Sequence, residues 1–108
     1  MTAAEFRKIA LSLPEAVEAS HVGRPDFRIR GKIFASLGYP DGDYGAVMLA
    51  PEEQQKFIEL QPAAFSPAAG AWGRRGSTEV LLSAVDAENI RAAIASAWRH
   101  KAPKRLIH

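Results

Sequence analysis

The residues of this sequence that could do chemistry are arginines and lysines, and they gather in short segments. Residues 24–32 hold four cations against one acid, and residues 89–108 hold five cations and no acid. Two further arginines lie within residues 72–76, Trp-Gly-Arg-Arg-Gly. The nine candidates are Arg24, Arg28, Arg30, Lys32, Arg74, Arg75, Lys101, Lys104 and Arg105. Guanidinium and ammonium groups bind phosphate oxygens, so the predicted chemistry is binding of an anion, above all a nucleic-acid backbone.

Arg28 and Arg30 have the spacing best suited to this task. Residues two apart on a strand point to the same side about 7 Å from each other, close to the spacing of successive phosphates. A second interpretation stays open. Arginines on an open sheet face also keep that face soluble and discourage edge pairing, and cations in a last helical turn stabilise exposed carbonyls.

The arginine pair beside Trp72 allows two interpretations as well. Arg74 and Arg75 could form a phosphate-contacting turn with the indole as a stacking platform. Alternatively, Trp72 anchors a loop and the arginines are solvated. A small-molecule pocket lined by Trp72 and Arg74 is a third possibility.

Catalytic and metal-binding patterns are missing from the sequence. His21, His100 and His108 are far apart and form no HExxH pattern. Asp41 and Asp43 flank a turn glycine without the spacing of a calcium loop. The sequence contains no GK[ST] phosphate loop, no GxGxxG and no GxSxG. We therefore expect no enzymatic activity, no catalytic residue, no cofactor and no bound metal.

Length and composition describe one globular domain over residues 1–108, with 47% hydrophobic and 24% charged residues. The absence of cysteine excludes disulfides and thiolate metal sites. No run approaches the roughly 20 apolar residues that cross a bilayer, and residues 1–10 show no signal peptide. We therefore expect a cytoplasmic protein with no membrane partner.

Residues 26–37 predict a β-hairpin. We place its turn at Gly31-Lys32, which pairs Arg30 with Ile33 and sets the register of both strands. The side chains expected on the buried face are Phe27, Ile29 and Phe34. Those expected beside Arg28 and Arg30 on the opposite face are Ile33, Ala35 and Leu37.

Helices are predicted at three places. Thr2 and Glu5 form a capping box before an apolar stripe that ends at Pro14. Pro51 starts a second helix, which ends at residues 61–62. Asp86 caps the third, which ends at residues 102–103. Trp98 lies in the apolar stripe of this last helix, so we assign it to the core.

Strands are expected at residues 15–21, at 44–50 after a turn at 40–43, and at 77–84. Residues 62–76 lack periodicity and predict a long ordered loop with Phe65 and Trp72 as anchors. The order α-β-β-β-β-α-β-α predicts an α+β two-layer sandwich with an antiparallel sheet of about five strands. One sheet face would then stay partly open.

The chain resembles the MmcQ/YjbR-like family. The resemblance rests on LSLPEAVEASHVGRPDFRIRGKIFASL, VMLAPEEQQKF, AWGRRGSTEVLL and APKRL, which follow one another over nearly the whole chain. It implies a compact α+β fold with a β-sheet flanked by helices, similar in shape to type III secretion chaperones. Members are often labelled DNA-binding, with a double-wing arrangement as the suggested basis. By position, GRPDFRIRGKIF matches a wing, WGRRG a glycine-bounded loop and APKRL the C-terminal end. The family carries over no catalytic residues.

Two functions of different classes are therefore expected. The first is nucleic-acid (DNA) binding through a basic β-hairpin wing that uses Arg28, Arg30 and Lys32, with backbone contacts and little sequence readout. The alternative is a non-enzymatic protein- or peptide-binding module that uses the open sheet face, in a monomer or weak homodimer.

Overall fold

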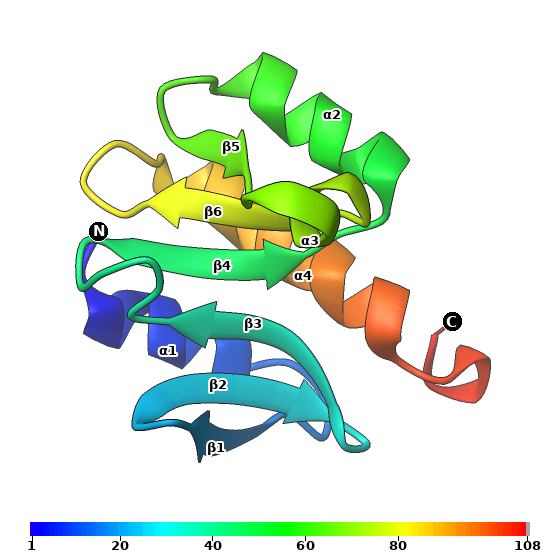
Figure 1. The fold of residues 1–108 in the computed structure, drawn as a ribbon. Helices are drawn as coiled ribbons and strands as arrows, with labels where there is room; N and C mark the ends of the chain where they lie inside the picture. The colour runs from blue at the N-terminus through cyan, green and yellow to red at the C-terminus, as the bar shows by residue number, and fades with distance from the viewer. Residues whose placement is uncertain (108) are drawn as a thin grey trace.

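The computed structural model describes residues 1–107 and confirms the α+β class (Figure 1). Its elements are α1 (Ala3–Leu11), β1 (Val17–His21), β2 (Arg24–Ile29), β3 (Lys32–Leu37), β4 (Tyr44–Met48), α2 (Pro51–Leu60), β5 (Phe65–Pro67), α3 (Gly70–Arg74), β6 (Ser77–Leu81), α4 (Ala87–Lys101) and the 3-10 helix η1 (Lys104–Leu106). No helix within residues 1–107 is both long and apolar enough to span a membrane.

The strands form one antiparallel sheet in the order β1-β2-β3-β4-β6-β5. This is one strand more than the roughly five expected, because β5 lies within residues 62–76, which the sequence predicts to be a loop. Helices α1 and α4 lie behind the sheet in Figure 1, α2 lies beside β5, and the short α3 passes in front of β6. The side of the sheet opposite α1 and α4 is called the open face below.

Helix α1 forms where the capping signal predicts it. The Glu5 N–H donates to Thr2 Oγ1 at 3.1 Å, and the Thr2 N–H donates to Glu5 Oε1 at 3.0 Å. The helix buries Phe6, whose ring lies 6.1 Å from that of Phe27. Gly45 of β4 makes room for this ring, because a Cβ there would lie 2.9 Å from Phe6 Cε2.

The other two predicted helices are also confirmed. Helix α2 begins at Pro51, and α4 follows Asp86, although the Asp86 side chain makes no capping hydrogen bond. Trp98 of α4 is 6% exposed, and its Nε1–H donates to the Pro14 carbonyl at 3.0 Å. The last helix is therefore tied both to the core and to the segment that follows α1.

The hairpin forms, but its predicted turn is wrong by one residue. The turn residues are Arg30 and Gly31, with φ of +50° and +82°, and Ile29 pairs with Lys32. Positive φ at both turn positions is the geometry that matches strand twist in a two-residue hairpin. Glycine therefore occupies the second turn position instead of the first.

A bulge in β3 changes which side chains share a face. Phe27 pairs with Ala35 and Arg28 pairs with Ile33, so Phe34 is an extra residue on β3. Phe34 and Ala35 are both fully buried, whereas Ile33 lies on the same face of the sheet as Arg28. The prediction that Ala35 and Leu37 accompany the arginines was therefore wrong. Buried Leu37 pairs with Gly45, the glycine that faces Phe6, and so belongs to the helix-covered face.

The predicted loop over residues 62–76 is replaced by β5 and α3. Phe65 is buried as expected, with its ring 5.4 Å from that of Phe57. Trp72 is 69% exposed and anchors nothing, which corrects the prediction. The segment is held in place because Gly73 and Gly76 pack closely against neighbouring backbone.

Candidate functional site

The open face carries a groove of about 510 Å³ that runs along β4. Ile33, Ala46 and Met48 supply apolar floor residues from β3 and β4. Tyr39, from the connection before β4, and Trp72, from α3, also line it. Figure 1 shows that connection at the start of β4 and α3 near the other end of the strand, and a strand of five residues spans about 17 Å.

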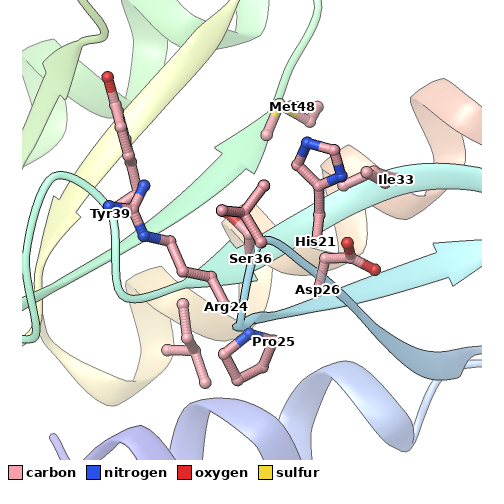
Figure 2. Close-up of a pocket in the computed structure, with 10 residues that line it drawn as sticks. His21, Arg24, Pro25, Asp26, Ile33, Ser36, Tyr39 and Met48 are labelled. Atoms are coloured by element: carbon pink, nitrogen blue, oxygen red, sulfur yellow. The ribbon is translucent and has the colours of Figure 1, made fainter.

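A cavity of about 400 Å³ continues the groove towards the β1–β2 turn and shares His21, Arg24 and Tyr39 with it (Figure 2). Figure 2 shows the Arg24 side chain extending to the phenol of Tyr39. Polar groups within this surface include the Ser36 hydroxyl and the half-buried carboxylate of Glu79 on β6. The groove thus combines apolar, aromatic, cationic and acidic groups.

Two exposed aromatic rings line the groove, and an arginine lies over each of them. Arg24 Cζ lies 5.0 Å from the centroid of Tyr39, which is 50% exposed. Arg75 Cζ lies 5.8 Å from the ring of Trp72, which is 69% exposed. Such a pair holds both side chains in place and leaves the other face of each ring available for stacking.

Two glycines fix α3, and with it Trp72, at the groove. A Cβ on Gly73 would lie 1.9 Å from the Ala68 carbonyl oxygen, and one on Gly76 would lie 1.8 Å from that of Leu49. Gly76 also has φ of +113°, a conformation that L side chains rarely adopt. The glycines of residues 72–76 thus have a packing role.

A buried polar network supports the same segment from below. Gln54 of α2 is 4% exposed, and its Nε2 donates to the Gly73 carbonyl at 3.0 Å and to Thr78 Oγ1 at 3.1 Å. The Thr78 hydroxyl donates in turn to the Gly76 carbonyl at 2.9 Å. The Gly73 carbonyl also accepts from the Gly76 N–H, and the Gly76 carbonyl from the Leu49 N–H, each at 3.1 Å, so the two side chains add a second hydrogen bond to each of these carbonyls.

The two arginines expected to contact phosphate are held by carboxylates of the same chain. Arg28 donates from Nε and Nη2 to buried Asp26 at 2.8 and 3.1 Å. Arg30 donates in the same way to Glu15 at 2.6 and 3.1 Å. These hydrogen bonds raise the pKa of both guanidinium groups and lower the pKa of Glu15. Half of the cations in residues 24–32 are therefore already neutralised.

The other basic residues of the hairpin and the C-terminal segment converge. Arg24 and Lys101 line the same groove, although 77 positions separate them in the sequence. Arg105 of η1 lies near enough to Glu15 to contribute to lowering its pKa. The two basic segments therefore approach each other at one side of the sheet.

The remaining candidates do not line the groove. Lys32, Arg74, Lys104 and Arg105 are exposed and lie outside the groove lining. Within residues 1–107, none of these four forms a salt bridge.

Sequence reasoning placed Ile33 on this face beside Arg28, but it missed the groove residues His21, Tyr39 and Met48. The turn at residues 40–43 was visible, but nothing local shows that the residue before Pro40 projects over the sheet. The alternation of residues 44–50 would have placed Met48 with Ala46 on one face, because residues two apart share a face. Within residues 1–107, the structure contains no group of three or more His, Asp or Glu residues placed to hold a metal ion.

The sequence matches a known protein family, and the fold is similar to those of solved structures. The YjbR family model matches residues 11–100. The crystal structure of a Deinococcus radiodurans protein with a DUF419 domain has a TM-score of 0.74 at 15% identity, covering 90% of this chain and 75% of the other. A Pseudomonas syringae protein has a TM-score of 0.70 at 15% identity, covering 94% and 99%. No curated protein matches the sequence of this chain. At this identity the solved structures establish likeness of fold, whereas the match over residues 11–100 establishes membership, and the chain belongs to the YjbR family.

Proposed function

We propose that this protein binds single-stranded nucleic acid across its open sheet face, with bases stacked on Tyr39 and Trp72 and phosphates near Arg24 and Lys101. The observation that carries the proposal is the pair of exposed aromatic–arginine contacts along one groove. Proteins that bind single strands combine stacking rings with cations that follow the backbone. Each stacked base contributes roughly 1–3 kcal/mol in such proteins.

The groove suits this ligand better than the hairpin tip does. A phosphate that contacts Arg28 or Arg30 must compete with a two-point carboxylate contact, and Asp26 would lose its partner while 2% exposed. A buried carboxylate left without its cation is strongly destabilising. No salt bridge within residues 1–107 involves Arg24 or Lys101, so neither side chain has to break a contact with a carboxylate before it binds a phosphate.

The acidic and apolar floor restricts what can bind. Glu79 repels a phosphate at its position but can accept a hydrogen bond from the amino group of cytosine or adenine. Ile33 and Met48 favour flat, apolar base surfaces over a hydrated backbone. The expected orientation therefore has bases towards the sheet and phosphates towards solvent.

The proposal is tested by fluorescence anisotropy with a labelled single strand of about 12 nucleotides. Two phosphate contacts, at Arg24 and Lys101, predict a log–log salt slope of about −1.4, which is roughly a 7-fold loss of affinity between 50 and 200 mM salt. Trp72→Ala removes one stacking ring and should weaken binding by roughly 5- to 150-fold. Because Trp72 is 69% exposed, this change should leave the fold intact.

Two matched variants separate the groove from the hairpin. Arg24→Ala/Lys101→Ala removes two groove cations and should reduce the salt slope by about 1.4. Arg30→Ala/Lys32→Ala removes two hairpin cations and should leave the slope nearly unchanged. If instead the hairpin variant lowers the salt slope, the groove variant does not, and duplex DNA binds more tightly than single strands, the result would support the DNA-binding wing. No binding at 50 mM salt with tens of micromolar protein would refute both nucleic-acid proposals.

A peptide is the second candidate occupant, favoured by the apolar floor residues Ile33, Ala46 and Met48. Mixed apolar and charged surfaces are typical of protein interfaces. An extended peptide with apolar and acidic side chains would meet this floor together with Arg24 and Lys101. Capture of such a peptide, without capture of DNA, would favour this candidate.

A further inference from the structure

The sheet has two edges of different character. Strand β5 forms one edge, with only three residues, the last of which is Pro67. Proline has no N–H to donate, and short strands ending in proline protect an edge from pairing. Strand β1 forms the other edge, with five residues and neither lysine nor proline. One edge is therefore protected while the other remains suited to accept a strand.

Exposed apolar side chains flank β1. Val17 at its start is 55% exposed, and Val22 in the turn after it is 84% exposed. Val22 has φ of +53°, which is unusual for a β-branched residue and costs backbone strain. An exposed valine in this conformation contributes little to the core of its own chain, so its side chain is available to contact another molecule.

The sequence of β1 is complementary to itself. In an antiparallel pair of β1 strands with the two-fold axis at Ala19, Glu18 lies opposite Ser20 of the second copy, and Val17 lies opposite His21. At each end of the paired strands, Val22 of one copy then lies opposite Ala16 of the other copy. A register centred on Glu18 would place two carboxylates opposite each other, and one centred on Ser20 would place Glu18 opposite Val22. Both alternatives are unfavourable.

We infer that β1 is a homodimer interface, which joins two copies into one continuous twelve-stranded antiparallel sheet. The pair closes on itself, because a chain of copies would have to use the protected β5 edge. Residues directly opposite in a sheet share a face, so the two open faces lie on the same side. His21, which lines the groove, lies at this seam, and the grooves of the two copies adjoin.

Sedimentation analysis from about 10 µM to 1 mM protein tests the interface, with a concentration-dependent dimer expected. Two substitutions at exposed Ser20 should act in opposite directions. Ser20→Glu places carboxylates opposite Glu18 twice per dimer and should weaken association by roughly 3- to 30-fold. Ser20→Lys places an ammonium group there and should tighten association by a smaller factor, because Arg7 Nε already donates to Glu18 at 2.9 Å.

Ser66→Lys on the exposed middle residue of β5 is the control for Ser20→Lys: it adds the same charge at the other edge, opposite Glu79 of its own chain, and should leave association unchanged. A wild-type protein that remains monomeric over this range would overturn the inference. Equal effects of Ser20→Glu and Ser20→Lys, or a change in association caused by Ser66→Lys, would also overturn it. Failure of nucleic-acid binding would not, because these readouts do not use a ligand.

Discussion

Replacing Gly76 with alanine tests how α3 is held against the sheet. The new Cβ would lie 1.8 Å from the Leu49 carbonyl oxygen, so the backbone must separate by about 1.5 Å to restore ordinary contact. Displacing well-packed structure in this way costs about 1–3 kcal/mol. The φ of +113° adds about 1–2 kcal/mol for a residue with a side chain. We therefore expect a loss of about 2–5 kcal/mol, which lowers the Tm by roughly 8–20 °C.

Urea unfolding followed by far-UV circular dichroism measures this loss against two matched glycines. Gly42 has open space and no positive φ, so Gly42→Ala should change stability by less than about 0.5 kcal/mol. Gly23 has open space but φ of +75°, so Gly23→Ala should cost about 1 kcal/mol. If Gly76→Ala unfolds at the same urea concentration as Gly42→Ala, the close approach to Leu49 does not constrain α3.

Three further substitutions test other parts of the structure. Gln54→Leu removes the buried donor shared by the Gly73 and Ser77 carbonyls and Thr78 Oγ1, and should cost about 1–2 kcal/mol in urea unfolding, accompanied by faster amide exchange in α3. Val22→Asn should stabilise the chain by about 1 kcal/mol, because asparagine tolerates the left-handed turn position; a lower unfolding midpoint would contradict this turn geometry. Glu15 has a lowered folded-state pKa, so its pair with Arg30 should stabilise the protein above the ordinary value of 4.5. That contribution should vanish as pH falls through the lower folded-state pKa, and Glu15→Gln should remove this part of the pH dependence of the urea midpoint.

The elements could be predicted where their signals are local. The capping box of Thr2 and Glu5, the proline at position 51 and the apolar stripe before Trp98 each specify a helix within a few residues. The hairpin register could not be predicted, because Gly31 can occupy either turn position and the bulge at Phe34 has no local signature.

The candidate site was only partly predictable for a related reason. The cations were visible in the sequence, but whether each is free depends on distant carboxylates. Arg30 is neutralised by Glu15, which lies 15 positions away, whereas Arg24 stacks on Tyr39. The exposure of Trp72 follows from the tight packing of Gly73, which only the folded chain reveals.

The proposed function requires that the open sheet face, and not the hairpin tip, receives the nucleic-acid strand. Amide and indole chemical shifts of ¹⁵N-labelled protein, titrated with a single strand of about 12 nucleotides, test it most directly. We predict the largest shifts at the Trp72 indole and at Ser36 and Ala46 on the open face, with little change at Gly31. Shifts confined to Gly31 and its neighbours, or no shifts at low salt, would refute binding at the open face.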